Sequence, residues 1–422
     1  MHRRLARIAV DLTPLRASRD LRLLLLGNVV SGLGTQAALV ALPYQVYIET
    51  RSPLLTGMLG AAELLPLMTL ALVGGALADR HDRRRLLLAD QIALVAVAAL
   101  LAALAFAGSP PVWMLFVLAA LLAGFGAVQN VVRAAIVPNL VAPQHLRAAL
   151  ATTFGLFQLT LVIGPGIAGV LIGVLGVGAA YTVDAVSCLA MVGALLAMSP
   201  QPPHGVPTGA EVLGVRHSIA EGLRFVRGSR ALLGSFAIDL AAMTFGMPRA
   251  LFAALAVGVY GAGAAGTGLL YAAVAAGATV AALTTGWLTH ARRLGRIVIV
   301  AVIVWGGAIA LAGVAGSLWL TALLLAVAGA ADSVSAVCRT TINQSVTPDR
   351  LRGRMSSVFS LVVTSGPRLG DVESGLAAAL GGVRFSFISG GVLTIAGVGL
   401  VMLAFPALLR FEPAPEPATA VS

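Results

Sequence analysis

The sequence predicts an all-α membrane protein with twelve transmembrane helices arranged as two six-helix bundles. Of its 422 residues, 59% are hydrophobic and only 11% are charged, and the mean hydropathy is +0.95. Soluble domains are close to half apolar and a quarter charged, so this composition excludes that class. The two cysteines, Cys188 and Cys338, lie in apolar stretches, which favours neither a disulfide framework nor a zinc site.

Twelve apolar runs are each long enough to cross about 30 Å of hydrocarbon as a helix. Only helices satisfy their own backbone groups inside a bilayer, so we expect no sheet. The first run is too long and too polar for a cleaved signal peptide. The predicted spans are 23–47, 54–78, 86–107, 112–135, 148–173 and 178–198, then 231–257, 264–289, 296–314, 317–340, 355–380 and 384–409.

These spans divide six and six around a Pro-rich stretch that begins near Pro200. The Pro-rich tail, from Glu412, is predicted to be disordered. The predicted organisation is therefore a cytoplasmic N-terminal segment 1–22, a first bundle 23–198, a cytoplasmic linker 199–230, a second bundle 231–409 and a cytoplasmic tail 410–422.

The basic residues predict the orientation. All 28 are Arg and the net charge is +11. With the N-terminus inside, 24 of the 28 lie in or beside inner loops, against Arg51 and Arg384 outside and Arg249 and Arg368 within spans. The positive-inside rule therefore predicts a multi-pass protein of the plasma (inner) membrane with both termini cytoplasmic. Because the charge is distributed along one leaflet, it does not indicate a nucleic-acid partner.

Short sequence motifs recur in the two halves of the chain. After span 4 the chain reads Arg133-Ala-Ala-Ile136 and continues to Leu146-Arg147, and after span 10 it reads Arg339-Thr-Thr-Ile342 and continues to Leu351-Arg352. A Gly-Pro pair occurs in both span 5 and span 11. Such internal repeats are typical of secondary transporters, so we predict a duplicated six-helix unit.

The segment between spans 2 and 3 reads Gly-Gly-Ala-Leu-Ala-Asp-Arg-His-Asp-Arg-Arg-Arg, from Gly74 to Arg85. It resembles the Gly-x-x-x-Asp-Arg-x-Gly-Arg-Arg motif of the major facilitator superfamily, with Asp82 at the position of the second Gly. The stretches after spans 4 and 10 look like the branch of enterobactin exporters and related multidrug efflux proteins. The resemblance extends from Leu21 to about Arg410 and implies the major facilitator fold.

This loop is the predicted conformational latch, formed by Gly75, Asp79, Arg80 and Arg83. A carboxylate at the C-terminal end of a helix is disfavoured by the helix dipole unless it finds positive partners. Asp79 is therefore expected to bind a nearby Arg or the N-terminus of a helix in the other half, in one conformation only. The alternative is a solvated turn. The family usually has an acid at the end of span 4 to pair with Arg83, whereas this chain has Arg133 there.

In span 5, Gly164, Pro165 and Gly169 resemble the antiporter motif of the superfamily, which implies export rather than import. Pro removes a backbone hydrogen bond, and Gly allows close helix approach. Ordinary packing of small residues is the alternative reading.

Ionisable residues inside spans are functional candidates because a charge there is costly. The proton-coupling candidates are Asp239, Glu63, Asp371 and Asp332, and the charge partners are Arg133, Arg339, Arg368 and Arg249. Arg368–Asp371 and Asp332–Arg339 each share a helical face, so they can pair. Asp239 has no ionisable residue within one turn, so burial favours its neutral acid and makes it the first candidate for carrying a proton. The alternative is that these acids only neutralise the Arg residues.

Polar side chains on spans 1, 4 and 5 are candidates for the substrate cavity, because these spans line it in the family. They could instead form interhelical hydrogen bonds. The candidates are Asn28, Gln36, Gln129, Asn130 and Gln158.

The predicted function is export of a small amphipathic compound, drug-like or siderophore-like, by proton antiport and alternating access. Its partners would be the substrate, protons and the lipid bilayer, with no nucleic acid, and we expect a monomer. A proton-coupled nutrient importer and a non-transporting receptor or accessory protein remain alternatives. No nucleotide-binding loop, nucleophile elbow or metal cluster is present in the sequence, so we expect no enzyme, no cofactor and no metal.

Overall fold

The computed structural model describes residues 13–108, 110–202, 221, 224–291, 293–348, 351–409 and 411. Regular structure within these residues is helical, with no strand. The predicted all-α fold is therefore confirmed. Much of the predicted N-terminal segment 1–22, linker 199–230 and tail 410–422 lies outside the described residues.

The chain folds into two compact units. The first unit contains the described residues of Met1–Ala210 together with Phe252–Ala272. The second unit contains those of Glu211–Leu251 and Ala273–Ser422. The segment 252–272 thus follows the linker in sequence but belongs to the first unit by its contacts.

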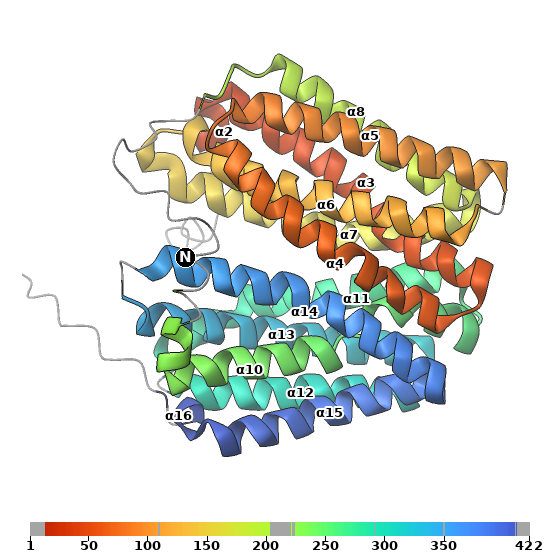
Figure 1. Ribbon diagram of the computed structural model, residues 1–422, viewed down its shortest axis with the longest axis vertical. Coiled ribbons are helices and arrows are strands. Elements are labelled where there is room, and N and C mark those ends of the chain that lie inside the picture. Colours follow the sequence, from red (N-terminus) through yellow and green to blue (C-terminus); the bar gives the residue numbers. More distant parts are fainter. Residues whose placement is uncertain are drawn as a thin grey trace, which may run out of the picture. The chain divides into compact units, whose positions relative to one another are not determined.

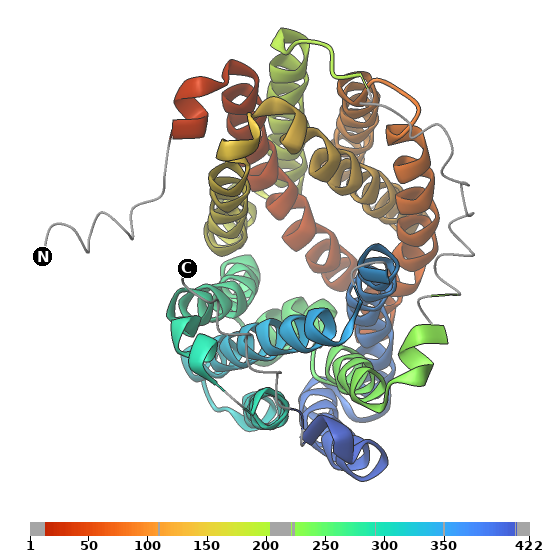
Figure 2. The ribbon, with the colours of Figure 1, turned by 90° about the vertical axis from the view of Figure 1, so that its left-hand side faces the viewer.

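In the first unit, α3 packs against α7 and α8, α4 against α6, and α5 against α6 and α8 (Figure 1). In Figure 2, α3 (red) runs through this unit beside α7. The helices are α2 (Thr13–Ala17), α3 (Arg19–Thr50), α4 (Pro53–Ala78), α5 (Arg83–Ala107), α6 (Val112–Ile136), α7 (Leu146–Leu175) and α8 (Val177–Ala197), with short turns η1 (Val137–Leu140) and η2 (Pro143–His145).

In the second unit, α12 packs against α13 and α15, and α10 packs against α14 and α15. The elements are α10 (Arg230–Phe245), η3 (Arg249–Leu251), η5 (Thr285–His290), α12 (Leu294–Val314), α13 (Leu318–Val346), α14 (Arg352–Gly381), α15 (Val383–Ala404) and α16 (Pro406–Leu409). The π-helical turn η4 (Ala254–Val259) lies in the first unit, and α11 (Gly263–Thr284) contributes to both.

The predicted span 231–257 is not one continuous helix. Helix α10 ends at Phe245, and the chain continues through Gly246 and Pro248 into η3 and η4. Pro248 has no backbone N–H to donate, which explains the interruption. The indole N–H of Trp305 donates to the Gly246 carbonyl at 2.8 Å, so one freed backbone group is satisfied inside the unit.

Local sequence fixes several helix boundaries. The hydroxyls of Ser18, Ser52 and Ser317 accept backbone N–H bonds at the starts of α3, α4 and α13, as N-cap residues do. Helices α7 and α14 both end at a glycine with positive φ, Gly176 at 83° and Gly382 at 87°. The same turn at equivalent places in the two halves agrees with the repeat predicted from the sequence.

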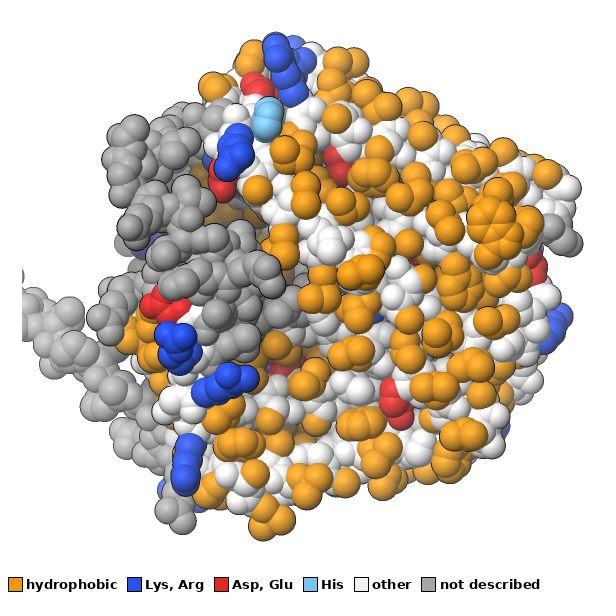
Figure 3. All heavy atoms as spheres, viewed as in Figure 1, with side chains coloured by type: hydrophobic (Ala, Val, Ile, Leu, Met, Phe, Trp, Pro, Cys, Tyr) orange, Lys and Arg blue, Asp and Glu red, His pale blue; other side chains and the backbone are white. Residues whose placement is uncertain are grey.

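The outer surfaces of the helices are hydrophobic, as lipid contact requires. Eleven helices of the described chain are long and apolar enough to cross a membrane. The remaining predicted span, 355–380, lies in the 30-residue helix α14, which carries Arg368, Asp371 and Glu373. Figure 3 shows hydrophobic side chains across the visible helices, with most of the visible Arg side chains near helix ends.

Candidate functional site

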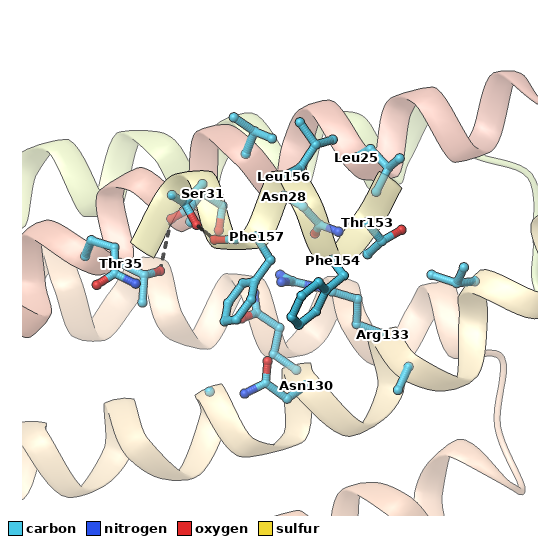
Figure 4. Close-up of a pocket in the computed structure, with 18 of the residues that line it drawn as sticks. Leu25, Asn28, Ser31, Thr35, Asn130, Arg133, Thr153, Phe154, Leu156 and Phe157 are labelled. Atoms are coloured by element: carbon cyan, nitrogen blue, oxygen red, sulfur yellow. Dashed lines mark hydrogen bonds between the residues drawn. The ribbon is translucent and has the colours of Figure 1, made fainter. Parts of the chain in front are cut away.

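A cavity of about 450 Å³ lies between α3, α6 and α7 of the first unit (Figure 4). Four of the predicted cavity residues line it: Asn28 and Gln36 from α3, and Gln129 and Asn130 from α6. The fifth, Gln158 on α7, is not among the lining residues. Residues from three predicted spans thus meet around one space.

Three of the four hydroxyl groups in the cavity wall are already bonded to their own helices. Thr35, Thr153 and Thr160 donate to carbonyls of their own helices at 3.0, 2.8 and 2.7 Å. By contrast, Asn28 Nδ2 and Gln129 Nε2 are buried without a hydrogen-bond partner among the described residues. The side-chain amides are therefore the polar groups that remain available to a ligand.

Arg133 contributes the only charge among the residues that line this cavity. Its Nε atom is buried and has no hydrogen-bond partner in the described chain. Figure 4 shows the Arg133 side chain extending from α6 into the same space as Phe154 and Phe157 of α7. The cavity therefore combines a guanidinium, side-chain amides and aromatic rings.

Asp90 on α5 is the functional candidate that sequence reasoning missed. Its side chain is 5% exposed, and neither carboxylate oxygen has a hydrogen-bond partner within the described residues. It lies on a helix that packs against α6, which carries Arg133. Asp90 lies in the predicted span 86–107, so the rule that flags ionisable residues within spans applies to it and would have found it.

The loop between α4 and α5 ties together helix ends of the first unit. Arg83 Nη1 donates to the Ala135 carbonyl at 2.9 Å, near the C-terminus of α6. Asp82 accepts from the backbone N–H of Arg85 at 2.9 Å, which caps α5, and from that of Gln201 at 2.9 Å. With no acid at the end of α6, Arg83 binds a terminal carbonyl, where the helix dipole favours a cation.

The other residues of the predicted latch, Gly75, Asp79 and Arg80, are more exposed or more loosely packed than Arg83. Asp79 is the C-cap of α4, and the Asp79 and Arg80 side chains are exposed. A Cβ atom at Gly75 would meet only Val131, at an ordinary 3.7 Å, so packing within this unit does not require a glycine there. The latch remains a prediction.

The Gly-Pro motif of α7 brings helices close together. A Cβ atom at Gly164 would lie 2.6 Å from Cβ of Gln36 on α3, and one at Gly169 would lie 2.9 Å from Cα of Gly268 on α11. Pro165 lies between them inside the helix. Small residues here allow close packing on two sides.

In the second unit, the expectation that Asp239 lacks a cation is wrong. Arg339 Nη1 of α13 lies 2.6 Å from Asp239 Oδ1 of α10, and both side chains are 1% exposed. The contact is an ion pair by distance and not a well-aligned hydrogen bond. The partner is 100 residues away in sequence, beyond the reach of helical spacing. Asp332 also pairs with Arg339, at 3.7 Å, as that spacing predicts.

A third carboxylate of this unit, that of Asp371, binds the backbone of the interrupted span. Asp371 Oδ1 accepts the backbone N–H of Ala250 at 3.0 Å. Its Oδ2 lies 3.7 Å from Arg368, so the predicted pair on one helical face is confirmed. The charge of Arg249 acts on both Asp332 and Asp371.

The four proton-coupling candidates are not brought together. Asp239 and Asp332 both form ion pairs with Arg339, whereas Asp371 accepts a hydrogen bond from the backbone of the interrupted span. Glu63 lies half-buried on α4 of the first unit. In the described chain, no three His, Cys, Asp or Glu side chains are placed to hold a metal ion.

The family follows from the sequence over almost its whole length. Residues 9–416 match the family described as transmembrane secretion effector. The chain belongs to this family, a branch of the major facilitator superfamily. The enterobactin exporter EntS of Citrobacter koseri is 29% identical over 418 residues, which covers 97% of both chains. EntS of Shigella boydii is 29% identical over 417 residues, which covers 97% of this chain and 98% of that one.

Solved transporters share the fold at low sequence identity. A bacterial homologue of the iron transporter ferroportin has a TM-score of 0.66 at 17% identity, covering 93% of this chain and 99% of that one. A bacterial homologue of the lysosomal transporter Spinster has a TM-score of 0.67 at 16% identity, covering 92% and 98%. The fold is that of a major facilitator transporter.

Proposed function

We propose that this protein exports a small amphipathic compound, siderophore-like or drug-like, by proton antiport and alternating access. The full-length match to a family of secretion effectors carries the proposal. The curated relatives named as enterobactin exporters favour a siderophore-like cargo. The cavity of the first unit supports it, because its amides and aromatic rings fit a cargo with both polar and apolar parts.

For energy coupling, we propose that Asp332 exchanges the proton and that Asp239 is the permanent counter-ion of Arg339. Asp239 makes the shorter contact, 2.6 Å, and is 1% exposed. Asp332 lies 3.7 Å from the guanidinium and is 21% exposed. The longer contact stabilises the ionised form less, and the greater exposure lets water deliver or remove a proton. The first candidate for carrying the proton is therefore Asp332 in place of Asp239.

On the basis of the Arg distribution, we further propose that both termini of the protein lie on the cytoplasmic side of the plasma membrane. We also propose that it acts as a monomer. Reporter fusions after Arg410 and within 200–215 should both read cytoplasmic. An external reading at either position would contradict this orientation.

Accumulation of a compound panel in an efflux-deficient host tests the export. We expect expression to lower intracellular levels of one or more amphipathic compounds, and collapse of the proton gradient to restore them. Proteoliposomes with an imposed pH gradient provide the direct measurement. Accumulation driven in the opposite direction would favour the importer, and no movement of any compound would favour a receptor.

A further inference from the structure

Among the buried side-chain atoms of the cavity lining that have no hydrogen-bond partner in the described chain, donors outnumber acceptors. Three buried donor atoms on its lining residues have no partner in the described chain: Asn28 Nδ2, Gln129 Nε2 and Arg133 Nε. Among the buried side-chain acceptors of the lining, only Asn28 Oδ1 also lacks a hydrogen-bond partner in the described chain. Buried polar groups are normally satisfied, so this excess of donors points to a ligand that brings acceptors.

The charge of the cavity lining also favours a ligand that brings hydrogen-bond acceptors. Arg133 is the one ionisable residue in its lining, which contains no carboxylate. A guanidinium binds carboxylate, sulfonate or phosphate groups through charge-assisted hydrogen bonds. A cationic ligand would meet no counter-charge in this wall.

The cavity wall also contains an apolar surface that can contact the apolar part of a ligand. The side chains of Phe154 and Phe157 are 60% and 48% exposed and line the cavity together with Leu150 and Leu156. Aromatic rings favour offset or edge-on contact with other rings. The wall therefore fits an aromatic body that carries an acidic group.

Asp90 supplies an internal competitor for Arg133. Its carboxylate is buried and has no hydrogen-bond partner in the described chain, and it lies outside the cavity lining on α5, which packs against the helix α6 that carries Arg133. On α8, Asp184 accepts a hydrogen bond from the thiol of Cys188 at 3.7 Å. When ionised, Asp90 would offset part of the charge of Arg133.

We propose that this cavity selects anionic aromatic compounds, with Arg133 binding the acidic group and Asp90 competing for the guanidinium. Asn28 and Gln129 donate to the remaining acceptors of the ligand. This inference rests on the proposed export function for its cargo. A membrane potential that is negative inside would favour the outward movement of such an anion.

Calorimetric titration of the purified full chain tests the inference with two matched probes, naphthalene-2-carboxylate and naphthalene-2-carboxamide. We expect the carboxylate to bind at least about tenfold more tightly, as a hydrogen bond to a charged group implies. Arg133→Gln should reduce the carboxylate affinity to that of the carboxamide, whose own affinity should not change. Arg133→Lys, which keeps the positive charge, should retain part of the preference.

Asp90→Asn should act in the opposite direction. Removal of the competing charge should strengthen carboxylate binding by at least about twofold and leave the carboxamide unaffected. Arg147→Gln is the matched control, because Arg147 is exposed on α7 and lies outside the cavity lining. It should bind both probes as the wild type does.

Three results would overturn the inference: equal binding of the two probes by the wild type, no binding of either probe, or an unchanged preference in Arg133→Gln. The assay requires no transport. Absence of flux with the expected probe preferences would therefore overturn the proposed function alone. Proton-driven flux without these preferences would overturn the inference alone.

Discussion

In the first unit, Arg133 lines a cavity whose lining contains no carboxylate, whereas in the second unit Arg339 lies between two carboxylates. Both residues follow the same Arg-x-x-Ile pattern at the end of a helix in their half of the chain. The repeat thus places a guanidinium at equivalent positions, and the neighbouring helices give it different partners.

This difference shows how equivalent Arg residues of a duplicated unit can have different roles. Arg339 is 1% exposed and neutralised by Asp239, so its charge is part of the folded core. Breaking a buried pair by removing one partner costs about 3–5 kcal/mol, because the other charge is left buried and alone. Arg133 faces a cavity whose lining contains no carboxylate, so its loss leaves no counter-charge unpaired among the lining residues.

The largest expected effect is that of Arg339→Gln. The change leaves the buried carboxylate of Asp239 without its counter-ion and removes the guanidinium 3.7 Å from Asp332, so we expect a loss of about 3–5 kcal/mol of stability. Thermal unfolding followed by fluorescence-detected size exclusion measures it. Arg133→Gln is the matched control and should remain folded. Similar unfolding temperatures for the two variants would remove the distinction between the units.

Within the second unit, Asp332→Asn should abolish efflux driven by a pH gradient, because the side chain can no longer bind and release a proton. Energy-independent exchange of substrate should survive, since it needs only the conformational cycle. Proteoliposome flux with and without a pH gradient measures both.

Asp239→Asn is the comparison variant for this measurement. It leaves Arg339 without its closest counter-charge, so it should lower the unfolding temperature as well as transport. Full uphill efflux by Asp332→Asn would show that Asp332 is structural and would make Glu63 or Asp371 the next candidate.

The loop of the first unit should show a smaller but distinct effect. If Asp79 acts as a latch, Asp79→Asn should strongly reduce flux while folded protein remains in the membrane, because this exposed carboxylate supports no packing. Asp82→Ala removes the cap of α5 and should instead cost about 0.5–2 kcal/mol of stability. Flux and unfolding temperature measured on both variants separate the two roles. Wild-type flux in Asp79→Asn would reject the latch.

The smallest expected effect is that of Asp371→Asn. The amide oxygen can still accept the Ala250 N–H, and the change removes the ion pair with Arg368, whose side chain is 28% exposed. Partly exposed pairs contribute about 1 kcal/mol or less. Asp371→Ala, which also leaves that N–H without its acceptor, should cost about 1–3 kcal/mol. Equal unfolding temperatures for the two variants would show that this hydrogen bond does not stabilise the interrupted span.

The fold was predictable because its causes are local. The apolar runs predicted the membrane-crossing helices, and the loops and glycines between them mark the ends. The interruption after Phe245 was not predicted, although Gly246 and Pro248 carried the signal. Hydropathy alone does not reveal it, since Pro and Gly are common inside membrane helices.

The candidate site was predictable in part. Asn28, Gln36, Gln129 and Asn130 were named from their spans and line one cavity. The resemblance supplied the knowledge of which spans meet, and the residues themselves did not. Asp90 was missed, and its relation to Arg133 depends on the packing of α5 against α6.

The sequence by itself determined the membrane class, the helical fold and the contacts within one helix. The Asp332–Arg339 and Arg368–Asp371 pairs follow from helical periodicity, which fixes the face on which each residue lies. Only the tertiary structure decided that Asp239 meets Arg339 and that polar residues of α3 and α6 face α7 across one cavity. The physical reason is that helix geometry relates residues a few turns apart, whereas contacts between helices depend on how their faces pack.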